Sequence, residues 1–409
     1  MKTRIIQIYR YLFCFLFVSV AFDGVIRIIP NLILILLALV FPFVIRKKHL
    51  KNLKNRSFLI FCSFLLCLVI SSILVANIND SMFVISKMSL ILVIYLLYQP
   101  IQGLNTNSTI KESFVFGVML ALVISVIKII TYTNQTGAFL FSIGNEINQT
   151  LVAERVYLGF MAVLSFIFSV ELYKKQTKFK KALHLFNVVF TFCFILLISA
   201  RMALLSIILV VFYQLLFLKK YKLIVLYVFG FIFLISLAFK ININLKNRFL
   251  FKDKNQSFTE NVIKWEPRIA IWNCAAQIYL NDPDYNKIIG YGSFLKTKKA
   301  LKNCYKVTIK DKLKRNWFIQ SKFNTHNQFL DVLISTGYIV FLLFLGLFME
   351  SFSRNYKNRY LISLLLVLFL FGMVENFFHR QIGVYLFALI LILSSTNISG
   401  CIKTKNGNE

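Results

Sequence analysis

The chain has 409 residues, of which 58% are hydrophobic, 16% aromatic and only 15% charged. A typical soluble domain carries about 25% charged residues, so this composition excludes an ordinary soluble protein and indicates an integral membrane protein. The formal net charge of +31 would suggest nucleic-acid binding in a soluble protein, but here the basic residues must first be assigned to a side of the membrane. We expect no nucleic-acid partner.

Apolar runs separated by polar links predict about twelve transmembrane helices. The first run follows a short basic segment and carries no small-residue cleavage site, so it is predicted to be retained as a helix. The predicted spans lie at about residues 11–22, 28–45, 57–76, 82–98, 114–130, 156–172, 185–200, 202–218, 223–239, 331–349, 360–374 and 382–395.

Basic clusters predict how these spans are oriented. The clusters lie at residues 46–56, 174–181, 219–222, 354–359 and 403–405. Lysine and arginine accumulate on the cytoplasmic side of membrane proteins, and all these clusters fall on one side if both termini are cytoplasmic. The long polar segment between the ninth and tenth spans is then extracytoplasmic.

That polar segment divides the chain into three predicted parts. The prediction is an all-α integral membrane protein with transmembrane helices 1–9 over residues 1–240, a partly helical extracytoplasmic loop domain over 241–330, and transmembrane helices 10–12 with a cytoplasmic tail over 331–409. The loop domain has an excess of lysine, but long loops cross membranes largely regardless of their charge. Water-dependent chemistry is expected in this loop domain.

No Walker loop, dinucleotide fingerprint or HExxH motif is present in the sequence, and no cysteine spacing matches a metal site. We therefore expect neither a cofactor nor a bound metal. Cys274 and Cys304 share the loop domain and would be in an oxidising compartment, where a disulfide is one possibility. The sequence leaves open whether they pair, because it does not give their geometry.

Two arginines stand out by their position. Arg201 lies at the tip of a tight hairpin between two apolar runs, where it either reaches the headgroups or serves a site. Arg268 follows Pro267, which suits the first turn of a helix. Its apolar neighbours Ile269, Trp272 and Ala276 predict an amphipathic helix that lies against the membrane face. A salt bridge to Glu266 or Glu260 is the alternative role of Arg268.

His326 is the most interesting polar residue of the loop domain. It precedes the tenth span beside Asn327, and a neutral imidazole there could take a proton near neutral pH, although a purely structural role is the alternative. Gly290 and Gly292 flank Tyr291 and predict a sharp turn.

These residues together resemble the O-antigen ligase and polymerase family. The matching pieces are Ser199-Ala200-Arg201 between two spans, Arg268 four residues before Trp272, Gly290-Tyr291-Gly292, and His326-Asn327-Gln328-Phe329-Leu330 followed by Gly337. The similarity covers about residues 185–347. It implies a multi-pass protein of the bacterial inner (cytoplasmic) membrane that uses an undecaprenyl-diphosphate-linked glycan donor, a lipid or glycan acceptor, and no metal. Membrane lipids are further expected partners.

Carried over by position, Arg201 and Arg268 would bind the lipid diphosphate and His326 would lie by the acceptor hydroxyl. The planar fork of arginine can form bidentate bonds with phosphate oxygens. The resulting hypothesis is an inverting single displacement, in which His326 helps to deprotonate the hydroxyl while the arginines stabilise the leaving diphosphate. Arg155, at the mouth of the sixth span, is a further candidate for the same anion. Gly290, Gly292 and Asn327 are predicted to contact substrate.

The loop domain is unusually rich in basic residues between positions 296 and 315. They form either a solvated face or a contact with anionic headgroups, and the alternative is attraction of an acidic glycan.

Three functions compete at this point. A ligase moves a finished glycan to an acceptor, a polymerase lengthens the lipid-linked chain, and a small-anion transporter would also have many spans. The spans carry few ionisable residues near their midplanes, which disfavours the transporter. The sequence does not separate ligase from polymerase.

Overall fold

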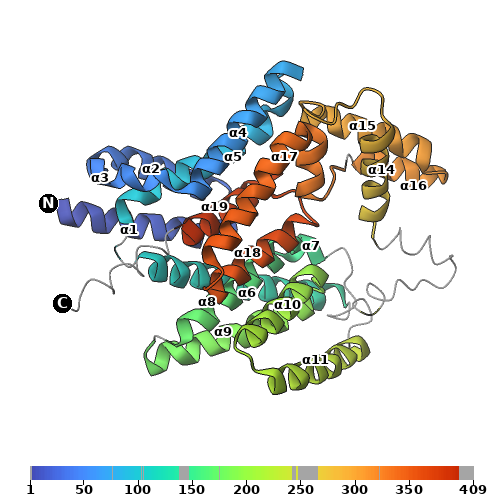
Figure 1. The fold of residues 1–409 in the computed structure, drawn as a ribbon. Helices are drawn as coiled ribbons and strands as arrows, with labels where there is room; N and C mark the ends of the chain where they lie inside the picture. The colour runs from blue at the N-terminus through green and yellow to red at the C-terminus, as the bar shows by residue number, and fades with distance from the viewer. Residues whose placement is uncertain are drawn as a thin grey trace. The chain divides into compact units, whose positions relative to one another are not determined.

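The computed structural model describes residues 2–75, 77–102, 104, 106–137, 147–174, 176–241, 246, 266–321 and 323–395 (Figure 1). Within these residues the regular structure is helical throughout and contains no β-strand. The predicted all-α class is therefore confirmed for this part of the chain. The predicted cytoplasmic tail after residue 395, much of the start of the loop domain, Glu260 and Trp265 lie outside the described residues.

The long helices follow the predicted spans in order. They are α1 (Lys2–Ser19), α2 (Ile28–Val44), α4 (Arg56–Val75), α5 (Asn79–Tyr98), α6 (Thr106–Thr136), α8 (Arg155–Tyr173), α9 (Lys178–Leu197), α10 (Arg201–Phe217), α11 (Tyr221–Ile241), α17 (Gln328–Asn355), α18 (Arg359–Gly372) and α19 (Gln381–Ser395). The loop domain contributes α14 (Arg268–Asn281), α15 (Phe294–Thr308) and α16 (Lys312–Ser321). Short helices are α3 (Lys47–Leu50), α7 (Ile147–Thr150), η1 (Val20–Phe22), η2 (Lys51–Lys54), η3 (Gln99–Ile101) and η4 (Phe377–His379).

Length and composition support membrane crossing for only some of these helices. Among the described residues, 7 helices are long and apolar enough: α1 with η1, α4, α5, α6, α8, α9 and α17. An eighth is α2 if its bent continuation through α3 and η2 belongs to the same span. The helices α10, α11, α18 and α19 are apolar but have shorter apolar stretches. A polytopic membrane protein is thus supported, while the count of about twelve spans stays a prediction.

The chain divides into two compact units. Unit 1 contains the described residues of Met1–His49, Leu97–Lys254 and Tyr356–Val367. Unit 2 contains the described residues of Leu50–Leu96, Asn255–Asn355 and Leu368–Glu409. The helices of the loop domain therefore belong to unit 2, together with α4, α17 and α19. The predicted boundaries at residues 240 and 330 divide transmembrane helices from an extracytoplasmic loop domain, and they stay a prediction.

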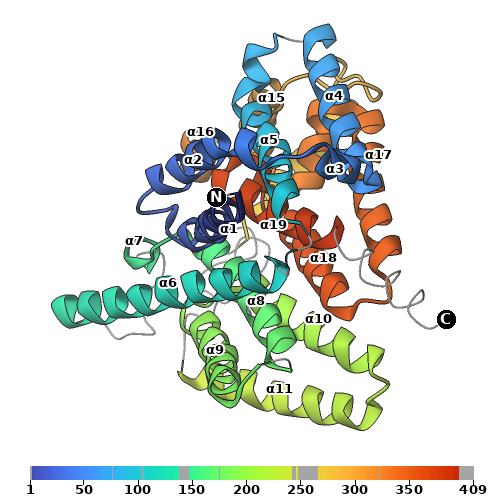
Figure 2. The same cartoon turned by 90° about the vertical axis from the view of Figure 1, so that its left-hand side faces the viewer.

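Unit 1 is built on close contacts between membrane helices (Figure 2). A Cβ atom added to Gly159 of α8 would lie 3.1 Å from the Cβ of Ala203 and 3.2 Å from that of Ala200, so α8 and α10 approach closely there. Asn187 of α9 donates to the hydroxyl oxygens of Ser165 (3.0 Å) and Ser169 (2.8 Å) of α8. Small residues and buried polar bonds of this kind hold helices together where no hydrophobic driving force acts between them.

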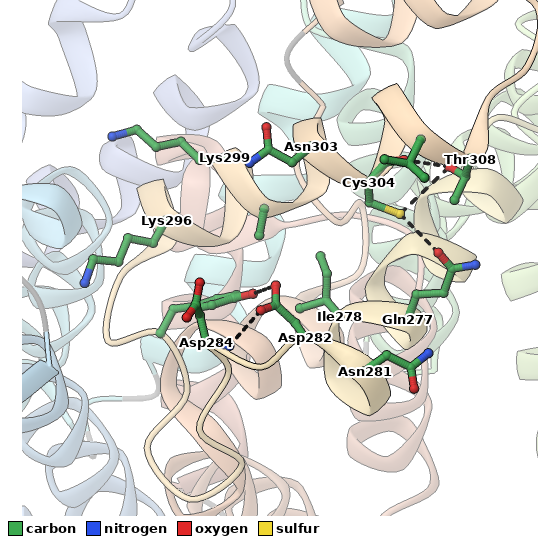
Figure 3. A pocket seen from close by; sticks show the side chains of 13 residues that line it. Gln277, Ile278, Asn281, Asp282, Asp284, Lys296, Lys299, Asn303, Cys304 and Thr308 are labelled. Carbon is green, nitrogen blue, oxygen red and sulfur yellow. Dashed lines mark hydrogen bonds between the residues drawn. The ribbon is translucent and has the colours of Figure 1, made fainter.

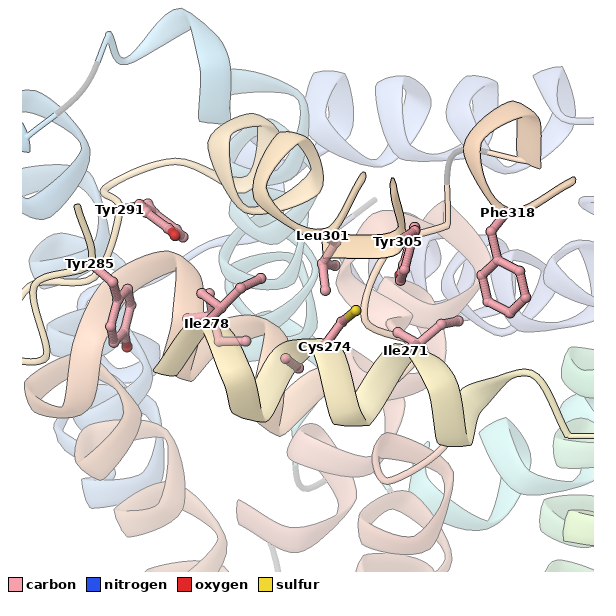
Figure 4. Close-up of a cluster of buried hydrophobic side chains, with 10 residues drawn as sticks. Ile271, Cys274, Ile278, Tyr285, Tyr291, Leu301, Tyr305 and Phe318 are labelled. Carbon is pink, nitrogen blue, oxygen red and sulfur yellow. The ribbon is translucent and has the colours of Figure 1, made fainter. Parts of the chain in front are cut away.

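Unit 2 joins the loop domain to the start of α17. Figure 1 shows α14, α15 and α16 gathered at one end of α17, and Figure 4 shows the hydrophobic cluster that they share. The cluster is made of buried side chains from these helices, from the segment between α14 and α15, and from α17: Ile271, Cys274, Ala275, Ile278, Tyr285, Tyr291, Leu301, Tyr305, Phe318 and Ile334. The loop domain thus has its own core, and α17 takes part in it.

The predicted contact of α14 with the membrane face stays a prediction. Ala276 is exposed, and Ile269 and Trp272 are partly buried. The buried face contains Ile271 and Cys274 and packs into the core of the loop domain. The helix is apolar on more than one side, so its sequence alone did not decide which side would be covered.

Cys274 and Cys304 form a disulfide that links α14 to α15. The sequence left this pairing open. The two cysteines are separated by 30 positions in the sequence, so the crosslink restricts much of the loop domain in the unfolded chain.

Helix α17 is broken at Gly337, and the turn around Gly290 fills the break. Gly337 has φ 76° and ψ 178°, so Tyr338 N cannot donate within the helix and donates to Lys287 O (3.0 Å) instead. In return, Tyr291 N donates to Ile334 O (3.2 Å). A Cβ atom on Gly290 would lie 2.5 Å from Gly337 N, so the two backbones touch. Backbone groups freed inside a span must find partners within the protein, and this turn supplies them.

Candidate active site

Three segments of unit 2 meet in a polar cluster. They are the start of α14, the residues that lead into α17, and the turn between α18 and α19. Two of the predicted site residues, Arg268 and His326, come from the first two segments, and Glu375 comes from the third. The cluster contains charged groups of both signs, which suits a site that transfers a proton and binds an anion.

Arg268 is the first residue of α14 and is held in place by two bonds. Its Nη1 lies 2.9 Å from Glu266 Oε1, and its Nε donates to the carbonyl oxygen of Val374 (3.0 Å). The side chain of Arg268 is 20% exposed. The salt bridge to Glu266, one of the roles considered from the sequence, is therefore present. The bond to Val374 places the guanidinium beside the turn that carries Glu375.

His326 faces the buried carboxylate of Glu375. Its Nδ1 lies 3.7 Å from Glu375 Oε2, which is an ion-pair distance and longer than a hydrogen bond. Burial of Glu375 acts to raise the pKa of its carboxyl group, but His326, Arg268 and Arg380 outweigh burial and hold that pKa below its ordinary value. Glu375 is thus kept as a carboxylate that can stabilise a positive charge on the imidazole.

The backbone at His326 is unusual. It has φ 43°, in the left-handed region that non-glycine residues rarely adopt, and its N–H donates to Asn324 Oδ1 (3.1 Å). The imidazole also packs edge-on against Phe323, with ring centroids 5.5 Å apart. Such strained conformations persist only where the surrounding structure fixes them, and they are concentrated at functional sites.

A second histidine–carboxylate pair fixes the segment before His326. His379 Nε2 lies 2.7 Å from Asp331 Oδ2, and the other oxygen of Asp331 accepts from Thr325 Oγ1 (3.2 Å). Asn376 Nδ2 donates to the same threonine hydroxyl (2.9 Å), and Trp272 Nε1 of α14 donates to Thr325 O (3.1 Å). This network joins all three segments at the residue that precedes His326.

Asn327 is the cap of α17. Its Oδ1 accepts from the backbone N–H groups of Phe329 (2.9 Å) and Leu330 (3.0 Å), which satisfies two donors at the start of the helix. The residue is 5% exposed. The structure thus gives Asn327 a structural role, and the predicted contact with substrate stays a prediction.

Gly290 and Gly292 also have structural roles. Both have positive φ angles, 64° and 63°, and Gly290 packs on the break of α17 described above. Ser71 of α4 donates to Ile289 O (2.9 Å), and Ser81 of α5 donates to Gly292 O (3.4 Å). The turn is therefore anchored to two further helices of unit 2. Contact with substrate stays a prediction for both glycines.

Arg155 and Arg201 belong to unit 1. Arg155 is the first residue of α8, is 8% exposed, and its Nε donates to Asn148 Oδ1 (3.2 Å). Arg201 is the first residue of α10 and is partly buried. Gly159 packs against Ala200 and Ala203, so the N-termini of α8 and α10, which carry the two arginines, are neighbours. Helix N-termini themselves favour anions. Their participation in one site with Arg268 and His326 stays a prediction.

The sequence interpretation missed Glu375, Asp331, Asn376 and His379. It treated residues 375–381 only as a short external turn. The available signal was the density of ionisable and amide side chains between two apolar spans, where such residues are often functional.

A cavity of about 660 Å³ lies between α14 and α15 (Figure 3). Its walls carry Gln277, Asn281 and Asp282 on one side and Lys299 and Asn303 on the other. These polar groups suit a hydroxyl-rich ligand, but neither histidine–carboxylate pair lines the cavity. Among the described residues, no group of three or more His, Cys, Asp or Glu is arranged to hold a metal ion. Metal independence stays a prediction.

Fold and site together define a polytopic helical membrane protein with a polar cluster formed by its loop domain and neighbouring segments. The family model described as O-antigen ligase matches residues 186–345, and this match supports an assignment to the O-antigen ligase and polymerase family. The family supports a ligase- or polymerase-type function in glycan assembly. The matched segment includes Arg201, Arg268 and His326, whereas Arg155 and Glu375 lie outside it. No curated protein matches the chain.

Proposed function

We propose that the protein is a membrane glycosyltransferase that moves a glycan from an undecaprenyl-diphosphate donor to an acceptor hydroxyl, in the manner of an O-antigen ligase. The observation that carries this proposal is the arrangement of His326 against the buried carboxylate of Glu375, with Arg268 fixed beside it through Val374. A base with an orienting carboxylate and an adjacent guanidinium supplies what such a transfer requires.

The donor side of the reaction needs positive charge for the leaving diphosphate. Arg268 offers a planar guanidinium that its bonds to Glu266 and Val374 hold in one orientation. Arginine binds phosphate oxygens through paired N–H donors, and preorganised donors stabilise charge that develops in the transition state. Arg201 and Arg155 are proposed to contribute further positive charge from unit 1.

The acceptor side needs removal of one proton. Nδ1 of His326 lies toward Glu375, which leaves Nε2 for the acceptor hydroxyl. In the proposed step the hydroxyl oxygen forms a bond to the anomeric carbon on the face opposite the diphosphate. The bond from that carbon to the diphosphate oxygen breaks, and the hydroxyl proton passes to His326. Glu375 stabilises the imidazolium, and the anomeric configuration is inverted.

Transfer from a lipid-linked glycan donor, measured in membranes, tests these roles. We expect Arg268→Ala to reduce the rate by about 100-fold or more, because one preorganised donor is lost. Arg268→Lys should recover only part of the rate, since a lysine lacks the planar fork. His326→Ala should reduce the rate by about 100-fold to 10,000-fold.

Lys302→Ala, at an exposed position of α15, is the matched control and should leave transfer unchanged. Undiminished transfer by a well-expressed Arg268→Ala or His326→Ala variant would remove that residue from the mechanism.

A polymerase that uses the same donor is the alternative, because ligase and polymerase differ only in the acceptor. Glycans of a deletion strain distinguish the two. Accumulation of lipid-linked polymer indicates the ligase, whereas loss of polymer length indicates the polymerase. Normal glycans with altered uptake of a small anion would contradict both and favour a transporter.

A further inference from the structure

The end of α15 and the start of α16 carry large apolar side chains that are highly exposed. We call residues 306–317 the basic tip. Within it, Val307 is 84% exposed and Leu313 is 82% exposed, and no other large apolar side chain among the described residues is as exposed. Trp317, one turn after Leu313 on the same face of α16, is 46% exposed. Neither helix is apolar enough to be a span candidate, so lipid around a span does not explain this exposure.

The apolar residues of the basic tip are surrounded by positive charge. Five basic residues lie in the tip, and Asp311 is its one acidic residue: Lys306, Lys310, Lys312, Lys314 and Arg315. The carboxylate of Asp311 accepts a hydrogen bond from Lys314 N (2.6 Å) and caps the start of α16. Five basic residues against one acidic residue leave the tip with a formal net charge of +4.

The same combination occurs at the start of α9, which is a span candidate. Phe179 there is 80% exposed and is flanked by Lys178, Lys180 and Lys181. At the end of a span, an exposed aromatic ring beside lysines is typical of the boundary between acyl chains and headgroups. The basic tip repeats this chemistry in a segment that does not cross the membrane.

The tip is continuous with the buried core of the loop domain. Phe318, the residue after Trp317, is fully buried in the core of the loop domain, and the disulfide at Cys304 joins α15 to α14 just before the tip begins. The other end of α15 lies at the end of a span candidate, because Lys296 Nζ donates to Val75 O of α4 (3.1 Å). The core also includes Ile334 of α17 (Figure 4). The loop domain is therefore attached at the level where these spans end.

We propose that the basic tip is a membrane anchor that inserts Val307 and Leu313 between the headgroups and acyl chains of an anionic bilayer surface, while its lysines contact the lipid phosphates. Exposed apolar side chains supply the insertion, and basic residues supply attraction to anionic headgroups. Tryptophan is enriched at membrane interfaces, so the half-exposed Trp317 would lie at the headgroup level beside Leu313. This anchor does not depend on the proposed glycosyl transfer.

An environment-sensitive fluorophore tests the anchor in the full-length protein. Leu313→Cys is labelled with nitrobenzoxadiazole in a background without the other free cysteines, with the Cys274–Cys304 disulfide retained. The labelled protein is placed in nanodiscs of phosphatidylcholine with or without phosphatidylglycerol. We expect blue-shifted emission and quenching by spin-labelled lipid, and both effects should be stronger with phosphatidylglycerol.

Asp284→Cys, at an exposed polar position of the same domain, is the matched control and should report water in both lipids. Replacing Lys306, Lys310, Lys312 and Lys314 by glutamine should abolish the dependence on phosphatidylglycerol. Equal emission at positions 313 and 284 would overturn the proposal. A blue shift without quenching by spin-labelled lipid would also overturn it, because it would indicate a protein partner on the tip.

Discussion

Glu375 is the residue on which the proposed proton transfer most depends after His326. The residue is 8% exposed, and the pKa of its carboxyl group is held below the ordinary value although burial acts in the opposite direction. A buried charge that is maintained against desolvation must be stabilised by its neighbours, here one imidazole and two guanidinium groups. The arrangement suits a carboxylate that orients a base and remains ionised itself.

Glu375→Gln should keep the shape of the side chain while removing its charge. We expect the transfer rate to fall by about 10-fold or more, because the imidazolium formed on His326 loses its counter-charge. Glu350→Gln, on α17, is the control and should transfer normally. Unchanged transfer by Glu375→Gln would contradict the role of Glu375.

The pH dependence of stability gives a second readout of the same variant. Because the folded-state pKa of Glu375 is lowered, its contribution to stability is present above the unfolded pKa and is lost as pH falls through the lowered folded value. Thermal unfolding of the detergent-solubilised protein should therefore lose this contribution on acidification in the wild type. Glu375→Gln should show a smaller loss over the same range.

At the scale of elements, the break in α17 is the feature most sensitive to substitution. A Cβ atom on Gly337 would lie 2.2 Å from Ile288 O, and its backbone angles are nearly exclusive to glycine. Gly337→Ala should lower the free energy of unfolding by about 1–3 kcal/mol from backbone strain alone, and further through the clash. Gly346, in the same helix, has open space around it, so Gly346→Ala should be neutral or stabilising by up to about 1 kcal/mol.

Thermal unfolding of both alanine variants measures this difference. Equal stabilities would show that the turn at residues 287–291 does not depend on the break in α17.

Some features of the helices could be predicted from the sequence and others could not. Hydropathy located the long apolar helices, because it reports the local property that bilayer insertion depends on. It did not predict the buried face of α14, since that face is decided by Leu301, Tyr305 and Phe318, which lie farther along the chain. For the same reason, Arg268 and His326 were recognised from their order and spacing, while Glu375 was missed. Its proximity to His326 arises only when the turn after α18 folds against the start of α17.

At the scale of the whole molecule, the disulfide bears on the membrane side of the loop domain. Disulfides form and persist in oxidising compartments, so a Cys274–Cys304 bond in cells agrees with an extracytoplasmic loop domain. Without reductant, denatured protein from cells should react with maleimide at two fewer thiols than reduced protein. Equal labelling would contradict the predicted topology of this domain.

Removing the bond should also destabilise the domain. The closure of a segment with separation 30 corresponds to about 3–4 kcal/mol in the chain-entropy description. The double variant Cys274→Ala, Cys304→Ala should therefore unfold at a lower temperature than the wild type. Cys193→Ala, which removes a free thiol from a span, should not.

The contact between Gly290 and Gly337 has a consequence for divergence within the family. A side chain on either glycine would clash with the backbone of the other segment. A larger residue at one position is therefore tolerated only if the turn and the helix break change together. Related chains that keep the break should carry glycine at both positions, and those with a continuous helix should be free to lose both. The pair should thus covary, although one member belongs to the turn before α15 and the other to the span candidate α17.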